Sequence, residues 1–165
     1  MYYKFSSINC QGKIYNKNCK LITVYLNIRN NTNIIAASNN TEPPIMSALL
    51  LRNPFLLHAK VGGHLAKTKY KIDDEDIINA ILYHTTGRPG MSLLEKIVYI
   101  ADYIEPGREH APNLDEVRRL SFRDLDEALL QILEDILVHL KESKKEIDPM
   151  TQRTYEFYKR KQSEE

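Results

Sequence analysis

From Ile45 onward, capping residues and helix-breaking residues divide the sequence into a succession of amphipathic segments. Ser92 stands directly before an apolar run and Glu95 follows three residues later, which is the capping-box pattern of a helix start. Capping residues precede two further segments, Asp73 or Asp74 in one case and Ser121 or Asp124 in the other. A helix with one apolar face buries that face against other helices. This part of the sequence therefore predicts an all-α helical bundle.

The predicted helices differ in how their apolar residues are distributed. They run from near Phe55 to Lys69, from the Asp73–Asp74 cap to His84, from Ser92 to just before Pro106, and over about 114–120, 124–144 and 151–161. In the long helix after Asp124 the apolar residues keep to one side, as in a helix that packs on a core. In the helix after Ser92 they surround Asp102 almost completely. We therefore expect that helix to be buried on most sides.

The first 44 residues have a different character from the rest. They are rich in asparagine and carry five basic side chains against one acid, Glu42. Residues 21–28 are β-branched and aromatic enough to form a short strand, and nothing else in this segment favours regular structure. The prolines of Thr41–Pro44 restrict the backbone and mark a boundary. We expect an irregular or short-stranded segment over 1–44, followed by a helical part over 45–165.

The composition excludes several classes of protein. A formal net charge of +1 argues against a strongly basic protein that coats nucleic acid. No apolar run approaches the roughly 20 residues that cross a bilayer, so no membrane partner is expected. There are two cysteines, Cys10 and Cys19, and no leader peptide is recognisable. We expect a cytoplasmic protein, and the sequence gives no information on its oligomeric state.

Four residues near the middle of the chain suggest metal-assisted phosphate chemistry. His84 and Asp102 are of the residue types that bind metals. Arg88 and Arg108 each follow a glycine, and a guanidinium group can donate two hydrogen bonds to phosphate oxygens. Structural interpretations stay open for all four. Asp102 could form a salt bridge, His84 could stabilise a helix C-terminus, and the arginines could be solvated surface residues.

Other candidate residues are less specific. His58 lies near a helix start, and His64, six positions later, falls outside the spacing by which two histidines share a metal on one helix face, so we expect it to be exposed. Tyr83 and Tyr103 could stack on a base, although tyrosine at helical spacing is more often part of a core. The sequence contains no P-loop, no GxGxxG and no HExxH motif.

Four strings taken together resemble the YqeK-like branch of the HD-domain phosphohydrolases, over about residues 48–165. They are His58-Ala59-Lys60-Val61-Gly62, Tyr83-His84-Thr85-Thr86-Gly87-Arg88, Met91-Ser92-Leu93-Leu94-Glu95-Lys96 and Ala101-Asp102-Tyr103-Ile104-Glu105-Pro106-Gly107-Arg108. The resemblance implies an all-α, HD-domain-like metalloenzyme that hydrolyses diadenosine tetraphosphate symmetrically into two ADP with a di-iron centre. A dinucleoside polyphosphate would be its partner.

The resemblance also implies residue roles. His58 and His84 would bind one metal and Asp102 the other. Substrate and its phosphates would be contacted by Arg88, Glu105, Arg108 and Tyr103. Two cations of this kind bind a bridging water, lower its pKa and hold the phosphoryl oxygens, while arginines neutralise developing charge.

The N-terminal segment departs from this family. The family has a histidine on its first helix and then an adjacent His-Asp pair, whereas no histidine precedes His58 and no aspartate precedes Asp73. We hypothesise that residues 1–44 are a frame-shifted or non-homologous translation, the alternative being a diverged start. The di-metal site is then expected to be incomplete, and an impaired remnant that binds nucleotide or metal weakly is the alternative to the enzyme. Helix faces left uncovered would make the chain marginally stable or prone to aggregate.

Overall fold

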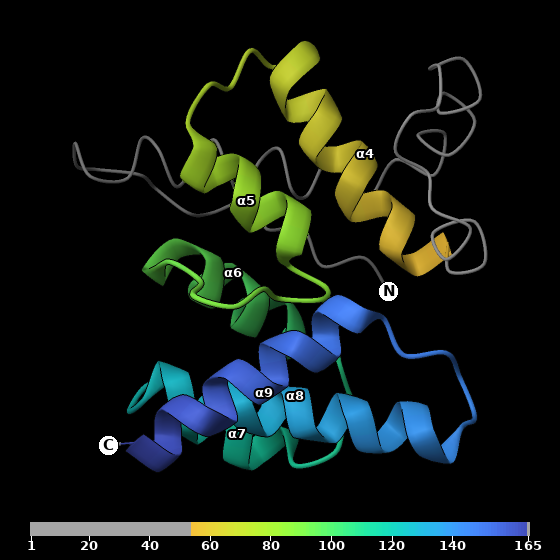
Figure 1. The fold of residues 1–165 in the computed structure, drawn as a ribbon, viewed down its shortest axis with the longest axis vertical. Coiled ribbons are helices and arrows are strands. Elements are labelled where there is room, and N and C mark those ends of the chain that lie inside the picture. The colour runs from red at the N-terminus through yellow and green to blue at the C-terminus, as the bar shows by residue number, and fades with distance from the viewer. Residues whose placement is uncertain (1–53, 165) are drawn as a thin grey trace.

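The computed structural model describes residues 54–164, with side chains from Leu56 onward, and every regular element in that range is a helix (Figure 1). The helices are α4 (Pro54–Thr68), α5 (Glu75–Tyr83), α6 (Leu93–Tyr103), α7 (Leu114–Leu120), α8 (Leu125–Glu142) and α9 (Pro149–Glu164). The all-α prediction is confirmed for this part of the chain. The predicted strand over 21–28 and the boundary at Thr41–Pro44 lie outside the described residues.

Helix α6 joins two layers of the molecule. Figure 1 shows it between the α4–α5 pair and the group formed by α7, α8 and α9, and it packs on both α5 and α8. Its Leu94 and Val98 pack on a small core of α4 and α5, while Tyr99 and Ile100 belong to the larger core built with α8. Any site between the two layers is therefore positioned by α6.

The predicted helix starts are confirmed in atomic detail. The Ser92 hydroxyl accepts a hydrogen bond from the Glu95 amide at 3.2 Å, and the Glu95 carboxylate accepts one from the Ser92 amide at 2.7 Å. Asp74 and Asp124, and not Asp73 or Ser121, accept hydrogen bonds from the first amides of α5 and α8. These side chains satisfy amide groups that the first turn of a helix leaves unpaired.

The last helix is longer than the sequence analysis predicted. It begins at Pro149 and ends at Glu164, whereas the prediction was 151–161. Proline lacks only an amide hydrogen that the first turn does not use, so it is compatible with the first position of a helix. None of the described helices is long and apolar enough to cross a membrane.

The prediction that α6 is buried on most sides is wrong. Leu93 is 64% exposed, Ile97 is 46% exposed and Ala101 is also exposed, so every fourth residue forms an apolar stripe at the surface. The two cores cover the opposite side of the helix, where Glu95, Tyr99 and Tyr103 are buried. The apolar content of α6 therefore exceeds what the two layers cover.

Two glycines allow close contacts that fix the end of α5. A Cβ atom on Gly63 would lie 2.4 Å from Cδ2 of Leu82, so a larger residue on α4 at this position would require the Leu82 side chain to shift. Gly87 has φ of +64°, and a Cβ there would lie 2.7 Å from Cγ2 of Thr154 on α9. These contacts hold the segment around His84 between α4 and α9.

Candidate metal and phosphate site

The structure places two of the predicted metal ligands side by side. Nε2 of His58, on α4, lies 2.8 Å from Nε2 of His84, the residue that ends α5, and the two rings meet edge to face. His84 is 4% exposed, whereas His58 is half-buried. Residues 26 positions apart in sequence thus direct their ring nitrogens toward the same point.

The surroundings of His84 determine which of its nitrogens carries the proton. Nδ1 lies 2.7 Å from the carbonyl oxygen of Ile81. Because a carbonyl oxygen can only accept a hydrogen bond, Nδ1 carries the proton and neutral His84 presents the lone pair of Nε2. Metal-binding histidines are oriented in the same manner by a hydrogen bond from their second nitrogen.

The two Nε2 atoms lie slightly closer together than shared coordination of one metal would place them. Two nitrogens bound to one tetrahedral metal at about 2.0–2.1 Å lie roughly 3.3 Å apart. The observed 2.8 Å separation is that of a hydrogen bond between the two rings, so shared coordination would require the Nε2 atoms to move apart by about 0.5 Å. Among residues 54–164, however, no third histidine, cysteine or carboxylate joins the pair to form a group of three. The described residues therefore fit part of a metal site.

Asp102 lies on α6 and is held next to Arg108. One guanidinium nitrogen of Arg108 donates to the Asp102 carbonyl oxygen at 3.3 Å and lies 3.9 Å from Oδ2 of its carboxylate. The Asp102 side chain is 24% exposed, so it is not enclosed by apolar residues as the sequence suggested. Both open interpretations, a metal ligand and an ion-pair partner, are compatible with this position of the carboxylate.

Arg88 is engaged much more tightly. Its Nε and Nη2 donate to the two carboxylate oxygens of Glu95 at 2.7 and 2.8 Å, and its Nη1 lies 3.4 Å from the Pro89 carbonyl oxygen. The Glu95 side chain is fully buried. Hydrogen bonding to Glu95 raises the pKa of Arg88 above its usual value. A phosphate contact by Arg88 would require it to leave this partner.

Lys60 is a cation on α4 that contacts the end of α5 and that the sequence analysis did not select as a site residue. Its Nζ lies 4.6 Å from the centre of the Tyr83 ring, and burial lowers its pKa, with Asp148 acting in the opposite direction. The Arg88 guanidinium lies 5.8 Å from the same ring. Tyr83 is thus flanked by two cations immediately before His84, an arrangement favoured by the negative ring face. The position of Lys60 within the His58–Gly62 string was the available signal.

Tyr103 is part of the core. It is 7% exposed and its hydroxyl donates to the Pro112 carbonyl oxygen at 3.2 Å, while burial raises its pKa to about 12. The Arg108 guanidinium lies 5.3 Å from its ring centre. Tyr103 therefore supports the position of Arg108 from beneath.

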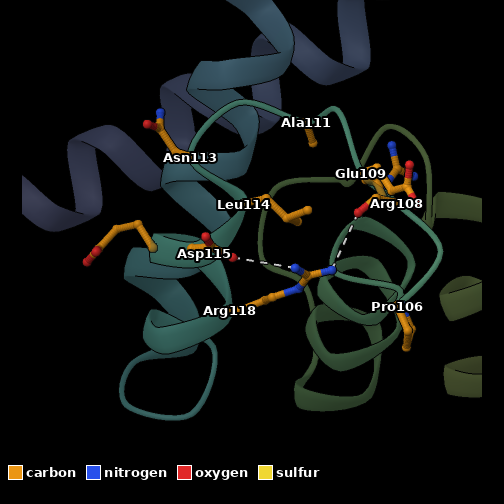
Figure 2. Close-up of a pocket in the computed structure, with 9 residues that line it drawn as sticks. Pro106, Arg108, Glu109, Ala111, Asn113, Leu114, Asp115 and Arg118 are labelled. Carbon is orange, nitrogen blue, oxygen red and sulfur yellow. Dashed lines mark hydrogen bonds and ion pairs between the residues drawn. The ribbon is translucent and has the colours of Figure 1, made fainter.

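Glu105 and Arg108 lie on the loop after α6, and a residue of α7 holds that loop. Nη2 of Arg118 lies 3.3 Å from the Glu105 carbonyl oxygen and 3.5 Å from that of Arg108. Figure 2 shows the Arg118 side chain reaching across from α7 to this loop. The sequence carried no signal for this role, because Arg118 and Arg119 look equivalent on a short charged helix.

The remaining histidines do not join this site. His64, predicted to be exposed, is exposed in the structure, as are His110 and His139. Among the described residues, the pair formed by His58 and His84 is therefore separate from the other three histidines.

The sequence of this chain is similar to one protein family and to several proteins of known name. A family model described as the HD domain matches residues 35–107. The chain is 49% identical over 109 residues to the symmetrical bis(5'-nucleosyl)-tetraphosphatase of Bacillus subtilis, with 66% of this chain and 58% of the relative covered. It is 44% identical to the protein of the same name from Halalkalibacterium halodurans, with 61% and 53% covered.

A solved structure resembles the whole described fold. It is a crystal structure from Clostridium acetobutylicum titled as a predicted HD superfamily hydrolase involved in NAD metabolism. The TM-score is 0.67 at 38% identity, and the alignment covers 86% of this chain and 67% of that one. By contrast, the chain spans little more than half the length of the curated relatives named above.

Proposed function

Because the chain belongs to the HD-domain superfamily of hydrolases, we propose that it is a metal-dependent phosphohydrolase acting on dinucleoside tetraphosphates. The specific reaction proposed is the symmetrical cleavage of diadenosine tetraphosphate into two ADP, from the names of its relatives. The spacing of the His58 and His84 nitrogens, 2.8 Å apart, is the structural observation that carries this proposal. Paired imidazoles with one nitrogen fixed by a carbonyl are suited to bind a metal ion.

We propose that His58 and His84 bind one metal and Asp102 a second, with iron the expected metal. A bound divalent metal would activate a water molecule and polarise the phosphoryl oxygens. The residues of the chain would provide orientation: the Ile81 carbonyl keeps the proton of His84 on Nδ1, so that Nε2 remains a ligand. Part of the ligand set lies outside the described histidine pair.

Substrate binding is proposed for the loop after α6. Arg108 is the better candidate for a phosphate contact, because its carboxylate partner Asp102 is 3.9 Å away and its side chain is 36% exposed. Glu105 lies on the same loop, and the Tyr103 ring lies against the Arg108 guanidinium. Arg88 would act on the site through Glu95 by fixing the loop that follows His84.

Product analysis tests the proposed reaction. The full chain, purified and supplied with ferrous or manganous ions, is incubated with diadenosine tetraphosphate, and the nucleotides are separated by ion exchange. Symmetrical cleavage gives ADP alone, whereas asymmetrical cleavage gives ATP and AMP in equal amounts. His84→Gln keeps a polar side chain of similar size but removes the imidazole and is expected to lose at least 100-fold in rate, about 2.7 kcal/mol.

The same experiment separates the enzyme from an impaired remnant. A remnant would release no ADP at any metal concentration, although it could still bind nucleotide. The two curated relatives named above carry the name of the enzyme, and no observation on the described residues favours the remnant. ATP and AMP as products, or no product, would contradict the proposed function.

A further inference from the structure

A pocket of about 520 Å³ lies between the loop after α6 and the start of α7 (Figure 2). Its walls include the apolar side chains of Pro106, Ala111 and Leu114 and the guanidinium groups of Arg108 and Arg118. Pockets that bind small molecules have volumes of about 300–1,000 Å³. The pocket is therefore large enough for a ligand the size of a nucleoside.

The walls of the pocket are held by specific contacts. Arg118 donates to the carbonyl oxygens of Glu105 and Arg108 on one side, and it pairs with Asp115 at 3.5 Å on its own helix. At the opposite wall the Asn113 amide donates to the buried carboxylate of Asp135 at 2.8 Å. A cavity whose sides are fixed before a ligand arrives loses less entropy on binding.

The charges around the pocket argue against binding of phosphate inside it. Three acidic residues line it, Glu109, Asp115 and Glu116, and two of them are already in ion pairs, Asp115 with Arg118 and Glu116 with Arg119. Arg118 is already committed to Asp115 and to the loop carbonyls. With Asp115 and Glu116 paired, the remaining charges of the pocket, Glu109 and Arg108, balance, and a pocket with little net charge suits an uncharged nucleoside better than a polyphosphate.

Arg108 connects the pocket to the proposed reaction site. It lines the pocket and also contacts Asp102, the proposed metal ligand, at 3.3 Å through the backbone carbonyl. Its Nε is buried without a hydrogen-bond partner among the described residues. A buried donor left unpaired in this manner destabilises the protein unless a ligand or water satisfies it.

We propose that this pocket binds one nucleoside end of the dinucleotide substrate, with Arg108 at the junction between nucleoside and phosphates. This rests on the proposed function for the link to turnover. The apolar walls would contact the base, and the carboxylates would accept hydrogen bonds from ribose hydroxyls or an exocyclic amine. The polyphosphate would extend from the pocket past Arg108 toward Asp102.

Adenosine, which has no charge, tests the pocket without requiring catalysis. The full chain is labelled with ¹⁵N, and its backbone amide shifts are followed as adenosine is added; a second titration uses inorganic tripolyphosphate. The proposal expects adenosine to shift the amides of Ala111, Asn113 and Leu114, and tripolyphosphate to leave those three unchanged. Adenosine shifts confined to other residues, or none, would overturn it.

A pocket-filling variant provides the kinetic test. Ala111→Phe places a ring in the cavity and is expected to raise KM for diadenosine tetraphosphate about tenfold with little change in kcat, because binding is lost equally in ground and transition states. Ala111 also packs on the larger core, so the thermal midpoint is measured in parallel.

A milder substitution keeps the test valid if Ala111→Phe fails to fold. Glu109→Gln changes an exposed residue at the pocket rim and removes one carboxylate. This variant is expected to raise KM for diadenosine tetraphosphate about threefold. Glu142→Gln, an exposed position at the end of α8 outside the pocket lining, is the matched control and should leave KM unchanged. An unchanged KM in both pocket variants would overturn the proposal.

Failure of the proposed function gives a different result. If diadenosine tetraphosphate is not hydrolysed but adenosine shifts the three pocket amides, the nucleoside site is supported and the reaction is wrong. If hydrolysis occurs and adenosine does not reach those amides, the reaction stands and the pocket assignment is wrong.

Discussion

The loops that follow α5 and α6 both carry an arginine after a glycine, yet they hold it in different ways. In the first loop, Arg88 closes both arms of its fork on the fully buried carboxylate of Glu95, at 2.7 and 2.8 Å. In the second, Arg108 lies 3.9 Å from the Asp102 carboxylate and leaves a buried Nε without a hydrogen-bond partner among the described residues.

The difference indicates a division of roles between the two loops. A guanidinium paired in bidentate fashion with a buried carboxylate is committed to the fold, since removing it would leave a charge without compensation. A guanidinium with weak partners and an unpaired donor can turn toward an incoming anion at little cost. The first loop therefore fixes His84, and the second is suited to respond to substrate.

The largest effect should come from breaking the pair in the first loop. Arg88→Met leaves Glu95 buried and unpaired, and we expect a loss of about 3 kcal/mol in the free energy of unfolding, or roughly 6–12 °C in thermal midpoint. Circular dichroism during heating measures this change. Adding Glu95→Gln, which keeps a capping side chain but removes the charge, should restore most of the loss. An unchanged midpoint in Arg88→Met would remove the basis of the comparison.

The matching substitution in the second loop should affect catalysis in place of stability. Arg108→Met removes a charged donor to phosphate, for which about 1.5–3 kcal/mol is expected, equal to a loss of roughly 10- to 100-fold in kcat/KM for diadenosine tetraphosphate. The thermal midpoint should change far less than in Arg88→Met. If Arg108→Met unfolds the protein and keeps its specific activity, the roles of the two loops are reversed.

Arg118 offers a smaller test of how the second loop is held. Arg118→Lys retains the charge but cannot reach both loop carbonyls at once, so a loss of about 1 kcal/mol is expected, a rise of roughly fivefold in KM at similar kcat. Arg119→Lys is the matched control, because the neighbouring side chain pairs with Glu116 and is 70% exposed. Equal effects of the two substitutions would show that Arg118 has no special role.

The smallest effect concerns the exposed stripe on α6, which lies between the two loops in sequence. Ile97→Ser removes an apolar side chain that is 46% exposed, so the thermal midpoint should change by the equivalent of about 0.5 kcal/mol or less. Exposed apolar patches promote association, so light scattering during concentration should decrease relative to the unmodified chain. A large loss of stability would mean that Ile97 is covered in solution.

The sequence predicted the local structure better than the partners of individual side chains. The caps at Ser92 and Asp124 depend on neighbouring residues and are confirmed, as is the short helix over 114–120. The ion pair between Arg88 and Glu95 could not be predicted in this way, because it depends on which side chains face the interior after the helices pack. Helical periodicity also could not show that Leu93 lies at the surface, because its exposure depends on how the helices pack.

The candidate site was predicted in a similar way. The resemblance selected His58 and His84 together, and the structure brings their Nε2 atoms to 2.8 Å. The resemblance could not show that Arg118 supports the second loop. Arg118 contacts backbone carbonyl oxygens, which every residue type has, so the contact cannot be predicted from the residues of the loop. The role of Arg108 is a prediction that Arg108→Met tests, and the role of Glu105 stays a prediction. The frame-shift hypothesis and the predicted boundary concern residues outside the described range.

Metal dependence is the most direct test of the account. The roles proposed for the histidine pair and for the loop after α6, and the proposed reaction, all require a bound metal. The full chain is stripped with a chelator, its metal content is measured by elemental analysis, and ADP release from diadenosine tetraphosphate is followed as ferrous ion is returned. The account predicts no release from the stripped protein and recovery in proportion to metal bound, with no recovery in His84→Gln. Full activity in the stripped chain, or none at any metal content, would contradict it.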